Sequence, residues 1–342
     1  MLALTRFALL VLVSLLAMTQ TTNTTQLNTA RILIYSATRD FRHDSIPTAV
    51  DALVQGGPSH QIAFDHTEDQ TWFTDERLAQ YDAVLFLSNT GEVLDDAGKA
   101  ALQRYLDLGG NFVAVHSASD ALRNTTWFIH EVGAAFDYHP EITNATVDII
   151  GPSHPSTEGL PNPWPVQDEM YNFKSDPRSI GAVVVLSANE SSYTGECFLL
   201  DIRYVSFNAV QDPGPRKFDQ GTPHPTAWYQ EHGAGVDSNG TAGRSFYTSL
   251  GHLNETWQNP TFLGHVFGGI QWTLQSNTTL AFNATAKVGN GTSESISSTS
   301  GSATGSSPSA TTSSPSSATP SWLSPKIILY GALGAIVTLL AL

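Results

Sequence analysis

The sequence predicts a large α/β domain with a mostly parallel central sheet, and three observations lead to this prediction. Short apolar segments alternate with amphipathic segments at the spacing of strand–helix–strand units. The segment 112–115 is apolar at every position, which is typical of a strand covered on both faces. The region from residue 30 to residue 282 is long enough for one domain of this class.

The first half of this region alternates regularly between expected strands and helices. The helix that follows the first strand begins near Asp44 or Ser45 and is expected to stop at Gly56. The next helix has acidic residues at its start and Gly109 as its C-terminal stop. The expected elements are strands at 31–35, 61–65, 81–87 and 112–115 and helices at 45–55 and 95–108.

The second half has a less regular pattern. The proline-rich segment 151–167 is expected to be a loop, and Pro260 is expected to start the last helix. The remaining expected elements are a short helix at 127–132 and strands at 146–150, 182–186, 227–230 and 244–250.

Polar residues follow several of the expected strands. The loop 39–43 follows the first strand, Ser88 and Asn89 follow the third, His116 and Ser117 follow the strand at 112–115, and His252 follows the last. In open α/β sheets, ligands bind at the carboxyl ends of the strands. If these strands run in the same direction, the polar groups meet along one edge of the sheet.

Two kinds of chemistry are open for such a group. A metal such as zinc could bind to His43, His116 and His252 together with Glu169 or Asp120. However, no H-x-x-x-H or H-E-x-x-H pair is present. We therefore favour hydrogen-bonding histidines and assign no metal ligand. Ser117 lacks the flanking glycines of a G-x-S-x-G turn, which argues against a serine nucleophile.

Five ordered blocks of the sequence resemble the ThuA-like (trehalose utilisation) family. The likeness runs from residue 31 to residue 274, and its blocks are 36–46, 109–118, 168–173, 227–230 and 243–252. The resemblance implies a flavodoxin-like three-layer sandwich of the class I glutamine amidotransferase-like superfamily and a role around sugars. Amidotransferases of that superfamily carry a cysteine where His116 and Ser117 stand here, and the single cysteine, Cys197, lies elsewhere, so glutamine hydrolysis is not supported.

The resemblance and the strand ends together give the candidate site residues. The predicted catalytic residues are His116, Glu169 and His252. The predicted substrate-binding residues are Arg39, His43, Ser117, Tyr171, Trp228 and Tyr229; the three aromatic side chains could stack on sugar rings, with core packing as the alternative. The cofactor stays open, with a divalent metal such as zinc as the candidate. The segment from Cys197 to Gln220 is longer than the family pattern predicts.

The two ends of the chain carry targeting signals. Residues 1–20 have the short apolar core of a secretory signal peptide. After the domain at 30–286, residues 287–325 form a Ser/Thr-rich stalk, and residues 326–342 form an apolar tail of the kind that signals a GPI anchor. A single membrane span is the alternative for the tail. These signals predict a protein on the extracellular face of the plasma membrane or in the cell wall, held there by a lipid anchor.

Dense glycosylation sequons agree with secretion. They lie at Asn23, Asn124, Asn144, Asn189, Asn239, Asn254, Asn277, Asn283 and Asn290. The net charge of −15 disfavours nucleic acid as a partner. The sequence thus predicts a cell-surface glycoprotein that acts on a carbohydrate by hydrolase- or lyase-type chemistry. The alternative is a non-catalytic carbohydrate-binding or structural surface glycoprotein.

Overall fold

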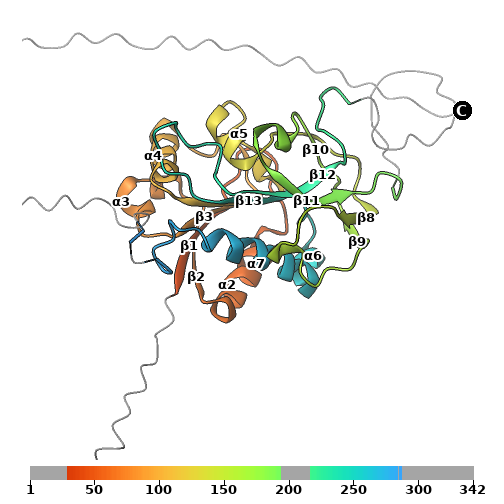
Figure 1. The fold of residues 1–342 in the computed structure, drawn as a ribbon, viewed down its shortest axis with the longest axis horizontal. Helices are drawn as coiled ribbons and strands as arrows, with labels where there is room; N and C mark the ends of the chain where they lie inside the picture. The colour runs from red at the N-terminus through yellow and green to blue at the C-terminus, as the bar shows by residue number, and fades with distance from the viewer. Residues whose placement is uncertain (1–28, 194–215, 284, 287–342) are drawn as a thin grey trace, which may run out of the picture. The chain divides into compact units, whose positions relative to one another are not determined.

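The computed structural model describes residues 29–193, 216–283 and 285–286, which are built around one nine-stranded sheet (Figure 1). The order of its strands is β2-β1-β3-β5-β13-β12-β11-β8-β9. These strands are β1 (Ala30–Tyr35), β2 (Ile62–Thr67), β3 (Ala83–Leu87), β5 (Asn111–Val115), β8 (Thr143–Ile149), β9 (Trp164–Asp168), β11 (Val183–Ala188), β12 (Pro225–Gln230) and β13 (Ser245–Thr248).

The sheet has a parallel core and an antiparallel extension. Strands β2, β1, β3, β5 and β13 all pair in parallel. Strands β12, β11, β8 and β9 continue the sheet from β13 in antiparallel pairs. The prediction of a mostly parallel sheet is therefore confirmed for the core, and the whole sheet is mixed.

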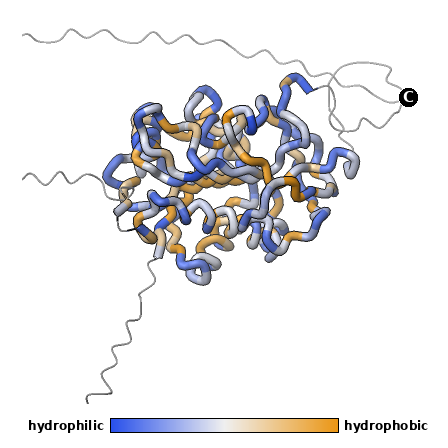
Figure 2. Tube along the Cα trace, viewed as in Figure 1, coloured by the Kyte–Doolittle hydropathy of each residue, from blue (hydrophilic) through white to orange (hydrophobic). Residues whose placement is uncertain are grey.

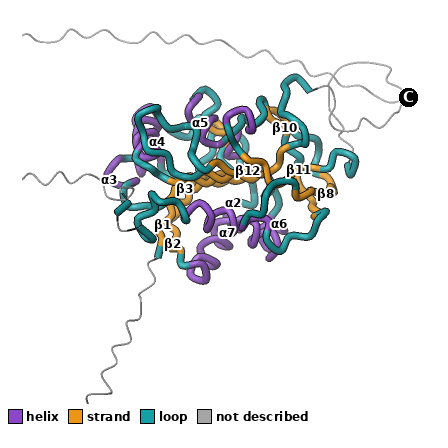
Figure 3. The backbone as a smooth tube through the Cα atoms, in the orientation of Figure 1, coloured by secondary structure: helices purple, strands orange, loops and turns teal. Residues whose placement is uncertain are grey.

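Helices cover both faces of this sheet, as Figures 1 and 3 show. On one face lie α3 (Asp75–Leu78), α4 (Asp96–Asp107) and α5 (Thr126–Val132), and on the other lie α2 (Ile46–Gly56), α6 (Asn254–Gln258) and α7 (Pro260–Leu274). Short 3₁₀ turns join these elements at η1 (Gly57–His60), η2 (Gln70–Trp72), η3 (His116–Ser119), η4 (Pro155–Thr157) and η5 (Pro177–Ile180). Two small two-stranded sheets pair β4 (Thr90–Gly91) with β6 (Asp120–Ala121) and β7 (Phe136–Tyr138) with β10 (Asn172–Phe173).

The side-chain alternation of β5 divides the core into two layers. Phe112 and Ala114 pack on the side of α4 and α5, whereas Val113 and Val115 pack on the side of α2 and α7. All four are fully buried, which is why this segment reads as continuously apolar. Figure 2 shows the apolar colour concentrated along these central strands.

Local signals explain where the main helices begin and end. The Asp95 side chain accepts a hydrogen bond from the Gly98 N–H (2.8 Å) at the start of α4, and the chain turns away after it at Gly109, whose φ is +94°. Asn259 caps α7 in the same way, ahead of Pro260. The helix α2 ends at Gly56 as expected, and the 3₁₀ turn η1 follows it to His60, where the chain reverses at Gln61, with a φ of 59°.

The prediction of a loop at 151–167 is wrong in part, because its end belongs to strand β9. The segment contains Pro163 and Pro165, which argue against a strand in the interior of a sheet. In the structure β9 is the last strand of the sheet, and a proline is tolerated at such an edge because no neighbour needs its missing N–H.

Several predictions concern residues outside those that the structure describes. They are the signal peptide, the stalk and the apolar tail at the ends of the chain, and Cys197 in the segment 194–215. In the part of the chain that the structure describes, no helix has both the length and the apolar character needed to cross a membrane.

Candidate functional site

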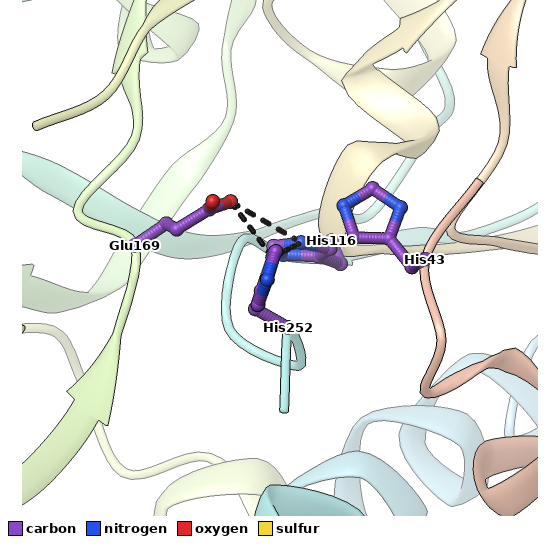
Figure 4. A group of neighbouring side chains, drawn as sticks. All are labelled: His43, His116, Glu169 and His252. Carbon is purple, nitrogen blue, oxygen red and sulfur yellow. Dashed lines mark hydrogen bonds and ion pairs between the residues drawn. The ribbon is translucent and has the colours of Figure 1, made fainter. Parts of the chain in front are cut away.

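Four polar side chains from distant parts of the sequence meet at the carboxyl edge of the parallel core (Figure 4). They are His43 in the loop before α2, His116 at the start of η3, Glu169 directly after β9, and His252 after β13. One nitrogen or oxygen atom of each lies within 4.8 Å of those of the other three. We call these four residues the histidine cluster.

The parallel pairing of the strands brings the histidines together. In register, β13 ends with Thr248 beside Val115 of β5, so the residues that follow both strands emerge at the same edge. Strand β1 ends at this edge too, because it pairs in parallel with β3, which pairs in parallel with β5. The expectation that His43, His116 and His252 meet at one edge of the sheet is confirmed.

His116 occupies a strained turn at the end of β5. Its φ is 58°, in the left-handed region that non-glycine residues seldom adopt, although histidine is among the more tolerant. The Tyr247 hydroxyl donates to its backbone carbonyl (2.9 Å) and helps to hold the turn. A sharp turn after this strand therefore exists without flanking glycines, and its left-handed residue is His116 rather than Ser117.

The hydrogen bond of His116 fixes its tautomer. Nδ1 lies 2.7 Å from the carbonyl oxygen of Ser249, which can only accept, so Nδ1 carries the proton. In the neutral ring, Nε2 therefore presents a lone pair to the centre of the cluster. There it lies 3.1 Å from the Tyr171 hydroxyl and 3.3 Å from Nδ1 of His252.

Glu169 faces two of these histidines with one oxygen. Its Oε2 lies 3.0 Å from Nδ1 of His252 and 3.6 Å from Nε2 of His116. This oxygen is buried, and its contact with His252 is an ion pair when that histidine is protonated.

Asp168, the neighbour of Glu169, has a structural role. Its carboxylate accepts backbone N–H groups of Gly251 (2.8 Å), Glu169 (2.9 Å) and His252 (3.3 Å), which ties the ends of β9 and β13 together. Burial raises the pKa of Asp168 to about 6, although these hydrogen bonds oppose the shift. Asp168 thus sets the spacing between Glu169 and His252.

The histidines of the cluster have different protonation tendencies. Burial, reinforced by the neighbouring histidines, lowers the pKa of His116 well below its usual value and that of His43 to about 4. Burial also disfavours the charged form of His252, but the carboxylate of Glu169 outweighs it and raises the pKa of that residue. His43 and His116 are therefore neutral near pH 7, when their ring nitrogens can donate lone pairs.

The structure divides the predicted substrate-binding residues into two groups. Tyr171 and Ser117 lie at the cluster: the Tyr171 ring packs on His116, and the Ser117 hydroxyl is 3.4 Å from Nδ1 of His43. Arg39 is exposed in the loop after β1, where its backbone N–H donates to the Thr90 carbonyl (2.8 Å).

Two predicted binding residues lie away from the site. The prediction for Trp228 is wrong, because this side chain is fully buried and donates its indole N–H to the Val132 carbonyl (2.8 Å). Tyr229 pairs with Phe246 near the start of β13, at the other end of that strand from His252, and its ring packs between His154 and Trp272. Asp120 was the alternative to Glu169 as an acidic metal ligand. Its carboxylate instead accepts two hydrogen bonds from the Arg123 guanidinium (2.5 and 2.6 Å).

A further histidine, His139, lies beside the cluster and was not predicted from the sequence. Nε2 of His139 lies 3.4 Å from Oε1 of Glu169, and its ring stacks on Tyr171. His139 directly follows β7, whose Tyr138 pairs with Asn172 of β10. Only this long-range pairing brings it to the site, and the alternation Phe136-Asp137-Tyr138 was the one sequence signal for the strand.

A pocket of about 150 Å³ borders the segments that carry the cluster. Its lining includes Asp168 and Leu253, the sequence neighbours of Glu169 and His252, and Trp164 of β9. It is smaller than the ~300–1,000 Å³ of typical drug-sized ligand sites. Oγ of Ser88 and Oδ1 of Asn89, which follow the neighbouring strand β3, are also buried and have no hydrogen-bond partner within the described part of the chain.

Comparisons with known proteins identify the relatives of this chain. The sequence model of the ThuA family, described as trehalose utilisation, matches residues 31–273. A solved ThuA-like protein from Bacteroides uniformis is 20% identical, with a TM-score of 0.52 over 73% of this chain and 93% of that one. Another, from Parabacteroides merdae, is 16% identical, with a TM-score of 0.53 over 72% of this chain and 91% of that one. These likenesses support the α/β fold. No curated protein matches the chain.

Proposed function

The chain belongs to the ThuA family, and from this premise we propose that it acts on a carbohydrate at the histidine cluster. The single observation that carries the proposal is the convergence of His43, His116, Glu169 and His252 within 4.8 Å at the ligand-binding edge of an open α/β sheet. The family description, trehalose utilisation, supports a sugar as the substrate class.

The strand order supports a flavodoxin-like arrangement as part of this proposal. Taken in chain order, the five parallel strands β1, β2, β3, β5 and β13 lie in the order 2-1-3-4-5. In sheets of this order, a ligand binds where the winding reverses, between the first and third strands. The loop that carries His43 follows β1 at that point.

The composition of the cluster limits the kind of sugar chemistry. Most glycoside hydrolases use two carboxylates that flank the scissile bond. Within the described cluster Glu169 is the only carboxylate, since Asp168 accepts three backbone N–H groups and Asp120 is paired with Arg123. This favours hydrolase- or lyase-type cleavage in which histidines assist Glu169.

We assign the chemistry to His116, Glu169 and His252, as acid/base groups or as metal ligands. Cleavage of a sugar C–O bond needs a proton for the departing oxygen, and either an activated water for hydrolysis or a base that removes a proton from carbon for elimination. His43, Ser117 and Tyr171, which surround these groups, would contact the substrate.

The setting of this activity is proposed from the ends of the sequence. A signal peptide, glycosylation sequons and a C-terminal apolar tail support a GPI-anchored glycoprotein on the extracellular face of the plasma membrane or in the cell wall. Its partners there would be a carbohydrate and, through the anchor, the membrane, and its acidic charge disfavours nucleic acid.

A turnover assay tests the proposal. The full chain is incubated with a panel of disaccharides, including trehalose, and aryl glycosides, and products are identified by mass spectrometry. We expect turnover of at least one sugar and a loss of about 100-fold or more in His116→Ala, the size typical of a lost acid/base group. His232→Ala, at an exposed histidine outside the cluster, is the matched control and should retain full activity.

Two results would contradict the enzyme proposal. Turnover that survives in His116→Ala and His252→Ala would place the chemistry elsewhere. Sugar binding without turnover of any tested compound would favour the alternative, a non-catalytic carbohydrate-binding protein.

A further inference from the structure

The atoms at the centre of the histidine cluster form a small triangle. Its corners are Nε2 of His116, Nδ1 of His252 and Oε2 of Glu169, and its sides measure 3.3, 3.0 and 3.6 Å. We propose that these three atoms, with His43 as a fourth group, bind one divalent first-row transition metal ion such as zinc. This inference deepens the proposed function, because it assigns a cofactor to the same site.

The sides of the triangle agree with bonds to a common ion. Zinc binds histidine nitrogens and carboxylate oxygens at about 2.0–2.2 Å, almost always in tetrahedral geometry. Two ligand atoms of a regular tetrahedron with such bonds lie about 3.3–3.6 Å apart, because the edge is about 1.6 times the bond length. The three measured separations scatter around the lower end of this range.

The protonation of His116 fits a metal ligand. Its Nδ1–H donates a hydrogen bond to the carbonyl of Ser249, 2.7 Å away, so its Nε2 lone pair faces the triangle. Histidines that bind metals nearly always donate their other ring N–H to a carbonyl or carboxylate in this manner, which fixes the ring orientation. The carbonyl of Ser249 is therefore already placed as the outer hydrogen-bond partner that a metal-binding His116 needs.

The buried oxygen of Glu169 provides a second observation. Oε2 is buried and lies 3.0 Å from Nδ1 of His252 and 3.6 Å from Nε2 of His116. Nε2 of His116 carries a lone pair and cannot donate to this oxygen, so the two electron-rich atoms face each other without a proton between them. A cation at the centre of the triangle would bind both Oε2 of Glu169 and the lone pair on Nε2 of His116.

The donor set selects the class of metal. Calcium and magnesium prefer all-oxygen surroundings, whereas imidazole nitrogens suit zinc, iron, nickel and copper. His43 lies beside the triangle, with its ring centroid 4.6 Å from that of His116 and 5.0 Å from that of His252. It would either complete the ligand set or stand beside a position left for water or substrate, as in catalytic zinc sites.

A binding measurement that needs no turnover tests the inference. The full chain is stripped with a chelator, and Zn²⁺, Mn²⁺ and Mg²⁺ are titrated in separately by calorimetry, with native mass spectrometry to count bound ions. We expect one Zn²⁺ per chain, Mg²⁺ bound far more weakly, and a rise in Tm on adding Zn²⁺. Glu169→Gln keeps the size of the side chain but removes its charge, and it should lower Zn²⁺ affinity on the order of 100-fold or more, at least as much as the loss of an outer-shell partner.

Matched controls separate the site from adventitious binding. His232→Ala and Glu158→Gln remove exposed groups of the same two types and should leave Zn²⁺ affinity unchanged. If Glu169→Gln fails to fold by circular dichroism, His252→Gln, at a partly exposed ligand, replaces it. No stoichiometric Zn²⁺ binding, or equal affinity in the cluster variants and the wild type, would overturn the inference. Zn²⁺ binding without any sugar turnover would leave it intact and count against the proposed function alone.

Discussion

Replacing Glu131 by glutamine is predicted to remove a large part of the pH dependence of stability. Glu131 lies on α5 and is fully buried. Its Oε2 accepts the Gly235 N–H (3.0 Å), and its Oε1 has no partner among the described residues. Gly233 packs so closely that a Cβ there would lie 2.3 Å from either oxygen. Burial raises the pKa of Glu131 to about 8.

The sign and size of the effect follow from this shift. Below the unfolded pKa of 4.5 the carboxyl is protonated in both states, and its contribution to stability is fully present. As the pH rises toward 8, the unfolded chain has released the proton and the native state still holds it. The free energy of unfolding therefore falls by about 1.4 kcal/mol per pH unit, or about 3 kcal/mol between pH 5 and pH 7. Above about pH 8 the contribution levels off.

The assay is urea unfolding of the wild type and Glu131→Gln at pH 5, 6, 7 and 8. Glutamine resembles the protonated carboxyl, so the two proteins should be within about 1 kcal/mol of each other at pH 5. At pH 7 the variant should be the more stable by about 3 kcal/mol. Glu158→Gln, at an exposed glutamate, is the control and should track the wild type. A stability difference that does not change with pH would refute the reasoning.

Four further predictions concern the packing, the loop that carries Arg39, the C-terminal tail and the glycosylation sequons. Trp228→Ala should lower the free energy of unfolding by about 3–5 kcal/mol, because it removes a fully buried side chain and its bond to Val132, and chemical denaturation measures this loss. Arg39→Ala, at an exposed loop position, should leave Tm within about 2 °C and raise KM for a sugar substrate; an unchanged KM would exclude Arg39 from binding. Phosphatidylinositol-specific phospholipase C should release the protein from intact cells, and retention on the membrane would favour a spanning tail. Enzymatic removal of N-glycans should lower its mass, since the sequons at Asn124 and Asn144 are exposed.

The parallel core could be predicted from the sequence because its signals are local. Each signal reports on one helix or strand without reference to distant residues. The apolar run 112–115 marks strand β5, and the acidic start and Gly109 mark the two ends of α4. The edge they define also follows from the sequence, since parallel strands deliver their carboxyl ends to one side. His43, His116 and His252 could therefore be placed together without knowledge of their distances.

In the antiparallel half, β8, β11 and β12 were expected as strands, but their pairing and strand β9 could not be predicted, because these pairings are long-range. Pro163 and Pro165 make β9 look like a loop, and only its edge position permits them. His139 reaches Glu169 through the pairing of β7 with β10, which no local pattern specifies. Trp228 stands beside polar residues in the sequence, but the alternation of its strand turns it into the core against Tyr247.

The most direct test of the account is a crystal structure of the chain soaked with Zn²⁺, with diffraction data collected on both sides of the zinc absorption edge. We predict one strong anomalous peak about 2.0–2.2 Å from Nε2 of His116, Nδ1 of His252 and Oε2 of Glu169. The absence of a peak at the histidine cluster, or a peak held only by histidines outside it, would contradict the account.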